Sequence, residues 1–144
     1  MQRKYMIAFC VVAALTSCDS TDPESLPVCG VGVTLTVSSG TTPTFDWNPS
    51  CRVGGLIIEE IGGSDLWLIF GVNMTNAIAP GVTYGLVPEG AVQNAPREGC
   101  PDECRPVQAQ PLSPGTTYQM AIAVFEPEGQ DENFEIVATA TFTQ

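Results

Sequence analysis

The sequence predicts an all-β domain, a two-sheet antiparallel β-sandwich of about seven strands within residues 29–144. From residue 29 onward, short runs alternate apolar and polar residues, which is the pattern of strands with one buried face. No run there has the 3.6-residue period of an amphipathic helix, and glycine- and proline-containing turns separate the runs. Strands that follow strands in this way bury their apolar faces against a second sheet.

The first two runs, residues 31–37 and 42–47, predict a hairpin. Alternation places the valines and the leucine of the first run on one face, and Phe45 and Trp47 on one face of the second. A Ser-Ser-Gly-Thr turn centred near Gly40 joins the two runs.

Antiparallel pairing about residue 40 gives the hairpin a definite register. Val33 then faces Trp47 on the apolar side. The same register brings Cys29 opposite Cys51, so the sequence predicts a disulfide at the open end of the hairpin.

Five further runs continue the strand pattern, at residues 53–61, 65–72, 78–87, 116–125 and 133–143. In the last run, alternation places Phe134, Ile136, Ala138, Ala140 and Phe142 on one face. Residues 88–107 contain four prolines and two cysteines, and we expect a long loop there.

Two segments carry a resemblance to a known fold family. Leu112-Ser-Pro-Gly-Thr-Thr-Tyr118, followed by an alternating apolar run, resembles the segment that leads into strand F of fibronectin type III domains. Trp47, followed by Asn48-Pro49, resembles the tryptophan of strand B in the same fold. The resemblance covers about residues 29–143 and implies that Tyr118 forms a tyrosine corner. The four cysteines and the long loop depart from that family, and a looser immunoglobulin-like sandwich is the alternative.

The N-terminus has the layout of an export signal. A basic start at Arg3 and Lys4 precedes ten apolar residues, 6–15, which are too few to span a bilayer. Leu15-Thr-Ser-Cys18 then resembles the bacterial lipobox, at which Cys18 receives a lipid and the peptide is cut just before it. The resemblance implies a signal peptide at 1–17 and a lipidated cysteine with a short polar tether at 18–28. The alternative is a plain signal peptide with Cys18 in a disulfide.

Removal of residues 1–17 leaves three arginines and all 16 acidic residues, a net side-chain charge of −13. Such a surface repels the phosphates of nucleic acids and offers no basic patch to anionic lipids. The chain has no histidine, and its one lysine is Lys4. These absences exclude a Ser-His-Asp triad, a His-ligated zinc and a Schiff-base lysine from the processed chain.

Four cysteines remain for the fold, Cys29, Cys51, Cys100 and Cys104, and two disulfides among them have three connectivities. The hairpin register favours 29–51, and proximity favours 100–104. Two cysteines without histidine are poor zinc ligands, so we expect no metal site and no cofactor.

Acidic clusters at residues 126–133 and at Glu98, Asp102 and Glu103 suggest calcium, although neither has the spacing of a known calcium loop. The alternative is a solvated acidic hairpin tip. Glu59 and Glu60 form a carboxylate pair at a strand end, and we assign it no catalytic role because no second catalytic feature accompanies it.

Residues 65–72 contain the candidate partner-binding side chains. Leu66, Leu68 and Phe70 share one face of this run, and Trp67 and Ile69 share the other. If the Trp67 face is open, it forms an apolar patch for a partner. The alternative is that both faces of this strand are covered.

The sequence therefore predicts a lipid-anchored protein of the bacterial cell envelope, on the periplasmic face or the cell surface. Its sandwich is expected to be non-catalytic and to bind an envelope protein or a glycan, with no nucleic acid involved. The alternative function is a small carbohydrate-binding domain, or a carboxylate-dependent accessory domain of an envelope enzyme.

Overall fold

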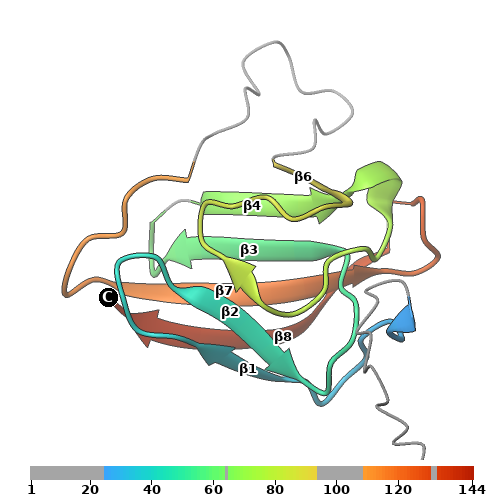
Figure 1. Ribbon diagram of the computed structural model, residues 1–144, viewed down its shortest axis with the longest axis horizontal. Helices are drawn as coiled ribbons and strands as arrows, with labels where there is room; N and C mark the ends of the chain where they lie inside the picture. The colour runs from blue at the N-terminus through green and yellow to red at the C-terminus, as the bar shows by residue number, and fades with distance from the viewer. Residues whose placement is uncertain (1–24, 64, 94–108, 131–132) are drawn as a thin grey trace, which may run out of the picture.

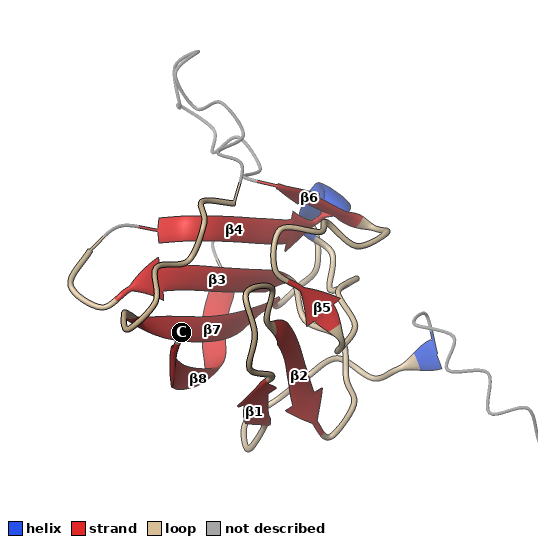
Figure 2. Ribbon diagram, turned by 60° about the vertical axis from the view of Figure 1, so that its left-hand side comes forward, coloured by secondary structure: helices blue, strands red, loops and turns tan. Residues whose placement is uncertain are grey.

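The computed structural model describes residues 25–63, 65–93, 109–130 and 133–144, which form two antiparallel sheets (Figures 1 and 2). One sheet has the strand order β1–β2–β5 and the other β6–β4–β3–β7–β8. The predicted all-β, two-sheet sandwich is confirmed. The elements are β1 (Thr34–Val37), β2 (Thr44–Asn48), β3 (Gly55–Glu60), β4 (Asp65–Gly71), the 3-10 turn η2 (Val72–Met74), β5 (Val82–Thr83), β6 (Ala91–Gln93), β7 (Thr117–Phe125) and β8 (Phe134–Thr143).

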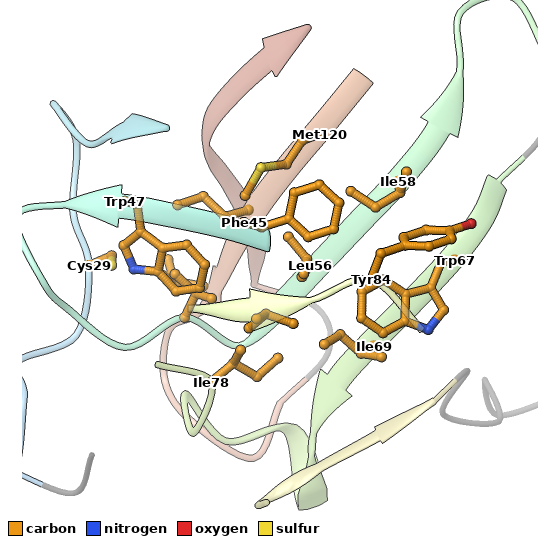
Figure 3. Packing of buried hydrophobic residues seen from close by; sticks show 14 of the residues in the cluster. Cys29, Phe45, Trp47, Leu56, Ile58, Trp67, Ile69, Ile78, Tyr84 and Met120 are labelled. Carbon is orange, nitrogen blue, oxygen red and sulfur yellow. The ribbon is translucent and has the colours of Figure 1, made fainter. Parts of the chain in front are cut away.

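The core lies between the two sheets, where both contribute alternate side chains (Figure 3). Phe45 and Trp47 come from β2, and Leu56 and Ile58 come from β3. Met120, Ile122 and Val124 of β7 complete its centre. Each large aliphatic side chain buried here stabilises the fold by about 1.5–3 kcal/mol relative to its exposed state.

The run predicted over 78–87 contains much less strand than expected. Only Val82–Thr83 forms β5, preceded by a single bridge between Ile78 and Val53. Pro80 and Gly81 interrupt the run because proline lacks the N–H that a ladder needs and Gly81 has φ +92°. Conversely, residues 91–93 of the predicted loop form β6 against β4.

The predicted register of the first hairpin is wrong by two residues. Leu35, not Val33, faces Trp47. Ser38 causes the shift, because its N–H donates to the Thr44 carbonyl and its Oγ accepts from the Thr44 N–H, both within 3 Å. The turn is therefore centred near residue 41, and an even shift leaves the same side chains on the core face.

Tyr118 forms the expected tyrosine corner. Its ring is buried, and its hydroxyl oxygen accepts a hydrogen bond of 2.7 Å from the N–H of Ser113, five residues upstream. This bond fixes the turn that leads into β7, which is the arrangement found in immunoglobulin-like sandwiches.

A bulge divides β8 and corrects the prediction for its side chains. Ala138 pairs with Ile122, but Ile136 pairs with Ala123, so Val137 is the extra residue. Ala138 and Phe142 pack against the core as expected. Phe134 and Ile136 do not, because the extra residue moves the first part of β8 to the opposite face.

Candidate functional site

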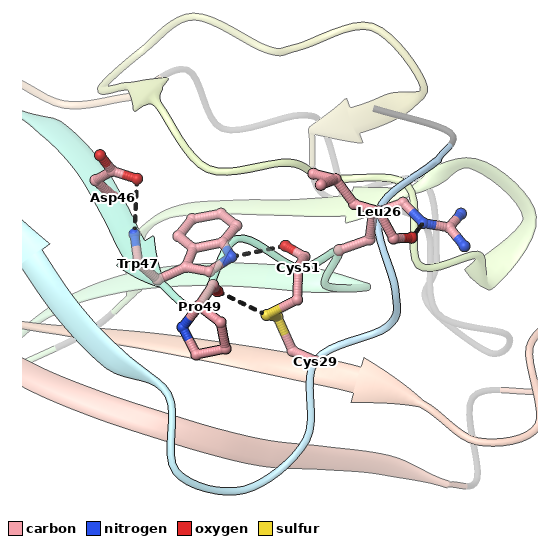
Figure 4. The surroundings of a disulfide bond; sticks show 7 residues. Leu26, Cys29, Asp46, Trp47, Pro49 and Cys51 are labelled. Atoms are coloured by element: carbon pink, nitrogen blue, oxygen red, sulfur yellow. Dashed lines mark hydrogen bonds between the residues drawn. A yellow bond between two sulfur atoms is a disulfide. The ribbon is translucent and has the colours of Figure 1, made fainter. Parts of the chain in front are cut away.

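Cys29 and Cys51 form a disulfide, as predicted, and both are buried (Figure 4). The predicted geometry is wrong, since Cys29 is not the end of the hairpin. Residues 27–29 run parallel to 51–53, joined by hydrogen bonds from Arg52 N–H to the Pro27 carbonyl (2.7 Å) and from Cys29 N–H to the Arg52 carbonyl (2.8 Å). The Trp47 indole N–H donates to the Cys51 carbonyl at 2.8 Å and so holds the bridge against the core.

Several predicted features lie outside the described residues. These are the signal peptide, lipidation at Cys18, the pair Cys100 and Cys104, and the acidic group Glu98, Asp102 and Glu103. Within the ranges that the structure describes, no helix is long and apolar enough to cross a membrane.

Trp67 and Ile69 do not form a surface patch, which corrects the predicted partner-binding site. They are 1% and 0% exposed and lie in the core, where Trp67 packs edge-on against Tyr84 at a centroid distance of 5.2 Å (Figure 3). The face of β4 that carries these two residues is the one that meets the second sheet. Any patch on β4 must therefore lie on its other face.

That other face carries apolar side chains on all five strands of the sheet, together with the polar Glu59, Gln119 and Thr139. We call it the outer face. Its apolar members are Ile57, Leu68, Phe70, Val92, Ala121, Ala123, Phe134 and Ile136. Val92 and Ile136 are 38% and 45% exposed, so apolar surface reaches solvent at both margins of the sheet.

Three phenylalanines cover one end of the outer face. Phe70, Phe125 and Phe134 contact one another with ring centroids 5.2–6.1 Å apart. They lie over Gly54 and Gly55, which leave room for them. A Cβ atom on Gly54 would approach the Phe125 ring to 2.3 Å, and one on Gly55 would approach the Phe134 ring to 2.8 Å.

Asn76 fastens the loop beside these rings to the end of β7. It is 1% exposed, and its amide reproduces a backbone pair with Phe125: Nδ2 donates to the carbonyl and Oδ1 accepts from the N–H, both at 2.9 Å. Its Nδ2 also donates to Glu128 Oε1 at 3.1 Å. Glu128, one of the acids considered for calcium, is thus engaged in a structural hydrogen bond.

The carboxylates of the described chain are dispersed. Glu59 pairs with Asp65 across β3 and β4, and Glu60 is exposed at the strand end. No group of three or more metal-ligating side chains occurs among the residues that are described.

The described tryptophans and tyrosines are all buried, at 1–6% exposure. Burial, with a smaller contribution from Tyr118, raises the pKa of Tyr84 to about 12, and the Tyr84 hydroxyl donates to the Gln110 carbonyl at 2.7 Å. The Trp67 indole N–H is buried without a hydrogen-bond partner. Rings in these positions cannot stack on a sugar without unfolding of the core.

Sequence reasoning missed the outer face because the alternation of β4 leaves two equally apolar faces. The usable signal was the Gly54-Gly55 pair at the start of a strand, since adjacent glycines there indicate a close approach by other groups. No protein-family model matches this chain, and neither a curated protein nor a solved structure does.

Proposed function

We propose that this protein is anchored in the bacterial cell envelope by lipid on Cys18 and that its sandwich is a non-catalytic binding module. The observation that carries the proposal is the order of basic start, ten apolar residues and Leu15-Thr-Ser-Cys18. Two or more acyl chains on one cysteine hold a protein stably at a membrane.

The described structure is compatible with a short tether. Near the start of the described chain, the Leu26 carbonyl accepts a hydrogen bond of 2.8 Å from Arg52 Nε and so attaches this segment to the domain. Leu26 lies eight positions after Cys18, so the chain between them reaches at most about 28 Å when fully extended. The sandwich would therefore work next to the membrane.

A binding role rather than catalysis is supported by residue types and their placement. The processed chain lacks histidine and lysine, and the described carboxylates do not converge. A glycan-binding role receives less support, because sugar recognition uses exposed aromatic faces and the described Trp and Tyr rings are in the core.

Mass spectrometry of the membrane fraction tests the anchor. We expect an N-terminal peptide that begins at acylated Cys18, and we expect Cys18→Ala to release the chain from the membrane without changing its melting temperature. A soluble chain that begins elsewhere, with Cys18 in a disulfide, would refute the proposal.

A further inference from the structure

Strand pairing brings the apolar side chains of the outer face into continuous rows. Val92, Phe70, Gly55, Ala123 and Ile136 are successive partners across β6, β4, β3, β7 and β8. Partners in register lie on the same face, about 4.5–5.5 Å apart. This row therefore crosses the whole sheet without a charged or polar side chain.

The neighbouring row is apolar over three of its strands. Leu68 pairs with Ile57, Ile57 with Ala121, and Ala121 with the exposed Thr139 of β8. Leu68 and Ile57 are partly buried and Ala121 is 7% exposed, so the polar side chain of this row stands at the β8 margin. The outward strand positions of a sandwich are ordinarily polar, and contiguous apolar surface in that position marks an interaction site.

Acidic side chains flank these rows on both sides, at the two ends of the strands. Glu59 follows Ile57 on the outer face and lies opposite Asp65, at the end near the β3–β4 turn. At the other end, the exposed Glu126 follows directly after β7. Among the residues with described structure, the single cationic side chain is Arg52, which is committed to the Leu26 carbonyl.

These charges indicate what kind of partner can bind to the outer face. A second copy would bring the same acidic ends and a net side-chain charge of −13 against its own kind. Anionic headgroups would meet the same repulsion. A protein surface with an apolar centre and basic side chains around it would be complementary to this face. Its apolar centre would contact the apolar rows, and its basic side chains would contact the flanking carboxylates.

We propose that the outer face of the five-stranded sheet binds a protein partner whose contact surface has an apolar centre and a rim of lysine and arginine. The inference rests on the proposed binding role of the sandwich, and it names the surface and the chemistry of the partner. Phe70 and Ala123 are 7% and 0% exposed, so the apolar contact comes from the exposed Val92 and Ile136 and from the partly buried Ile57 and Phe134. The carboxylates that flank the rows set the orientation and raise the association rate.

Site-specific photo-crosslinking in the native membrane tests the surface. A photoreactive residue is placed at Ile136 on the outer face or, as the matched control, at Leu86. Leu86 is 65% exposed and follows β5 of the other sheet. We expect one protein adduct from position 136 and none above background from position 86.

The captured protein is then purified and its binding to the acylated full chain is measured in detergent. We expect Ile136→Glu to raise the Kd about tenfold or more, because it places a charge where the interface buries an apolar side chain. Leu86→Glu should leave the Kd unchanged. Glu59→Gln with Asp65→Asn should lower the association rate severalfold and weaken its dependence on salt.

Four results would overturn the inference. They are a lipid adduct from position 136, a self-adduct, adducts of equal yield from both positions, and a captured partner whose Kd is unaffected by Ile136→Glu. Ile136 and Leu86 are both substantially exposed, so neither glutamate variant should unfold the domain, and a melting curve checks this. If Cys18 is acylated but the outer face binds no protein, this inference is rejected and the proposed lipid anchor stands. If the chain is soluble and unacylated, the proposed anchor is rejected.

Discussion

Replacing both half-cystines, in the double variant Cys29→Ala/Cys51→Ala, should destabilise the domain by about 3 kcal/mol. The two cysteines are 22 residues apart, and the loop-closure entropy that such a bridge removes from the unfolded chain corresponds to this value at 25 °C. For a domain of roughly this size, 1 kcal/mol corresponds to about 4 °C, so we expect the melting temperature to fall by roughly 12 °C.

Urea unfolding followed by tryptophan fluorescence provides the assay, because both tryptophans are buried in the folded state. The m-value should rise with the loss of stability, since a chain without the bridge unfolds to a more expanded ensemble. A loss below about 1 kcal/mol with an unchanged m-value would refute the entropic argument. A peptide map that links Cys29 to Cys100 or Cys104 would refute the pairing itself, and the Cys100→Ala/Cys104→Ala variant is the matched control.

Three further predictions address the core. Trp47→Phe should lower the free energy of unfolding, measured with urea, by about 1–3 kcal/mol more than Trp67→Phe. Of the two indole N–H groups, only that of Trp47 has a hydrogen-bond partner, and its removal leaves the buried Cys51 carbonyl unpaired. Equal decreases for the two variants would contradict this. Gly54→Ala should lower stability by about 1–3 kcal/mol through overpacking against the adjacent ring, whereas Gly30→Ala, in open space, should be neutral by the same measurement. Tyr84 should ionise near pH 12, above the ordinary tyrosine pKa of 10, so its contribution to stability is complete below pH 10 and is lost as the pH rises toward 12. Ultraviolet difference titration of the protein against its Tyr84→Phe variant measures this ionisation. A titration of Tyr84 near pH 10 would contradict the prediction.

The part of the fold that the sequence predicts well is the part that alternation determines. The two longest strands, β7 and β8, and the strand that carries Trp67 were expected within one or two residues of their observed bounds. Tyr118 was placed correctly because the Pro-Gly turn before it makes the corner recognisable. In these segments local chemistry and tertiary packing require the same conformation.

The errors arise where a single residue changes the outcome. Ser38 uses its side chain to extend the first hairpin pairing, and alternation contains no information about that bond. Val137 is one residue too many for β8, which moves Ile136 to the opposite face. A bulge cannot be read from residues 136–140, where every position is apolar or small.

The candidate surface was assigned to the wrong face of β4 for a related reason. Both faces of that strand are apolar, and only the position of the second sheet decides which of them is core. Trp67 packs into the sandwich, and the Phe70 and Phe134 rings beside Gly55 are left on the outer face. The choice depends on contacts between distant segments and is absent from the local pattern.

The bridge between Cys29 and Cys51 also determines how the domain would bear a mechanical load. If the protein is pulled through its N-terminus, as a tethered domain would be when its partner moves, the force first loads the hydrogen bonds of Leu26 and Pro27 to Arg52 and then reaches Cys29. It then crosses the covalent bond to Cys51 and bypasses β1 and β2, which lie between the two cysteines in the chain. The N-terminal hairpin therefore cannot be peeled away by traction on the tether while the bridge is intact.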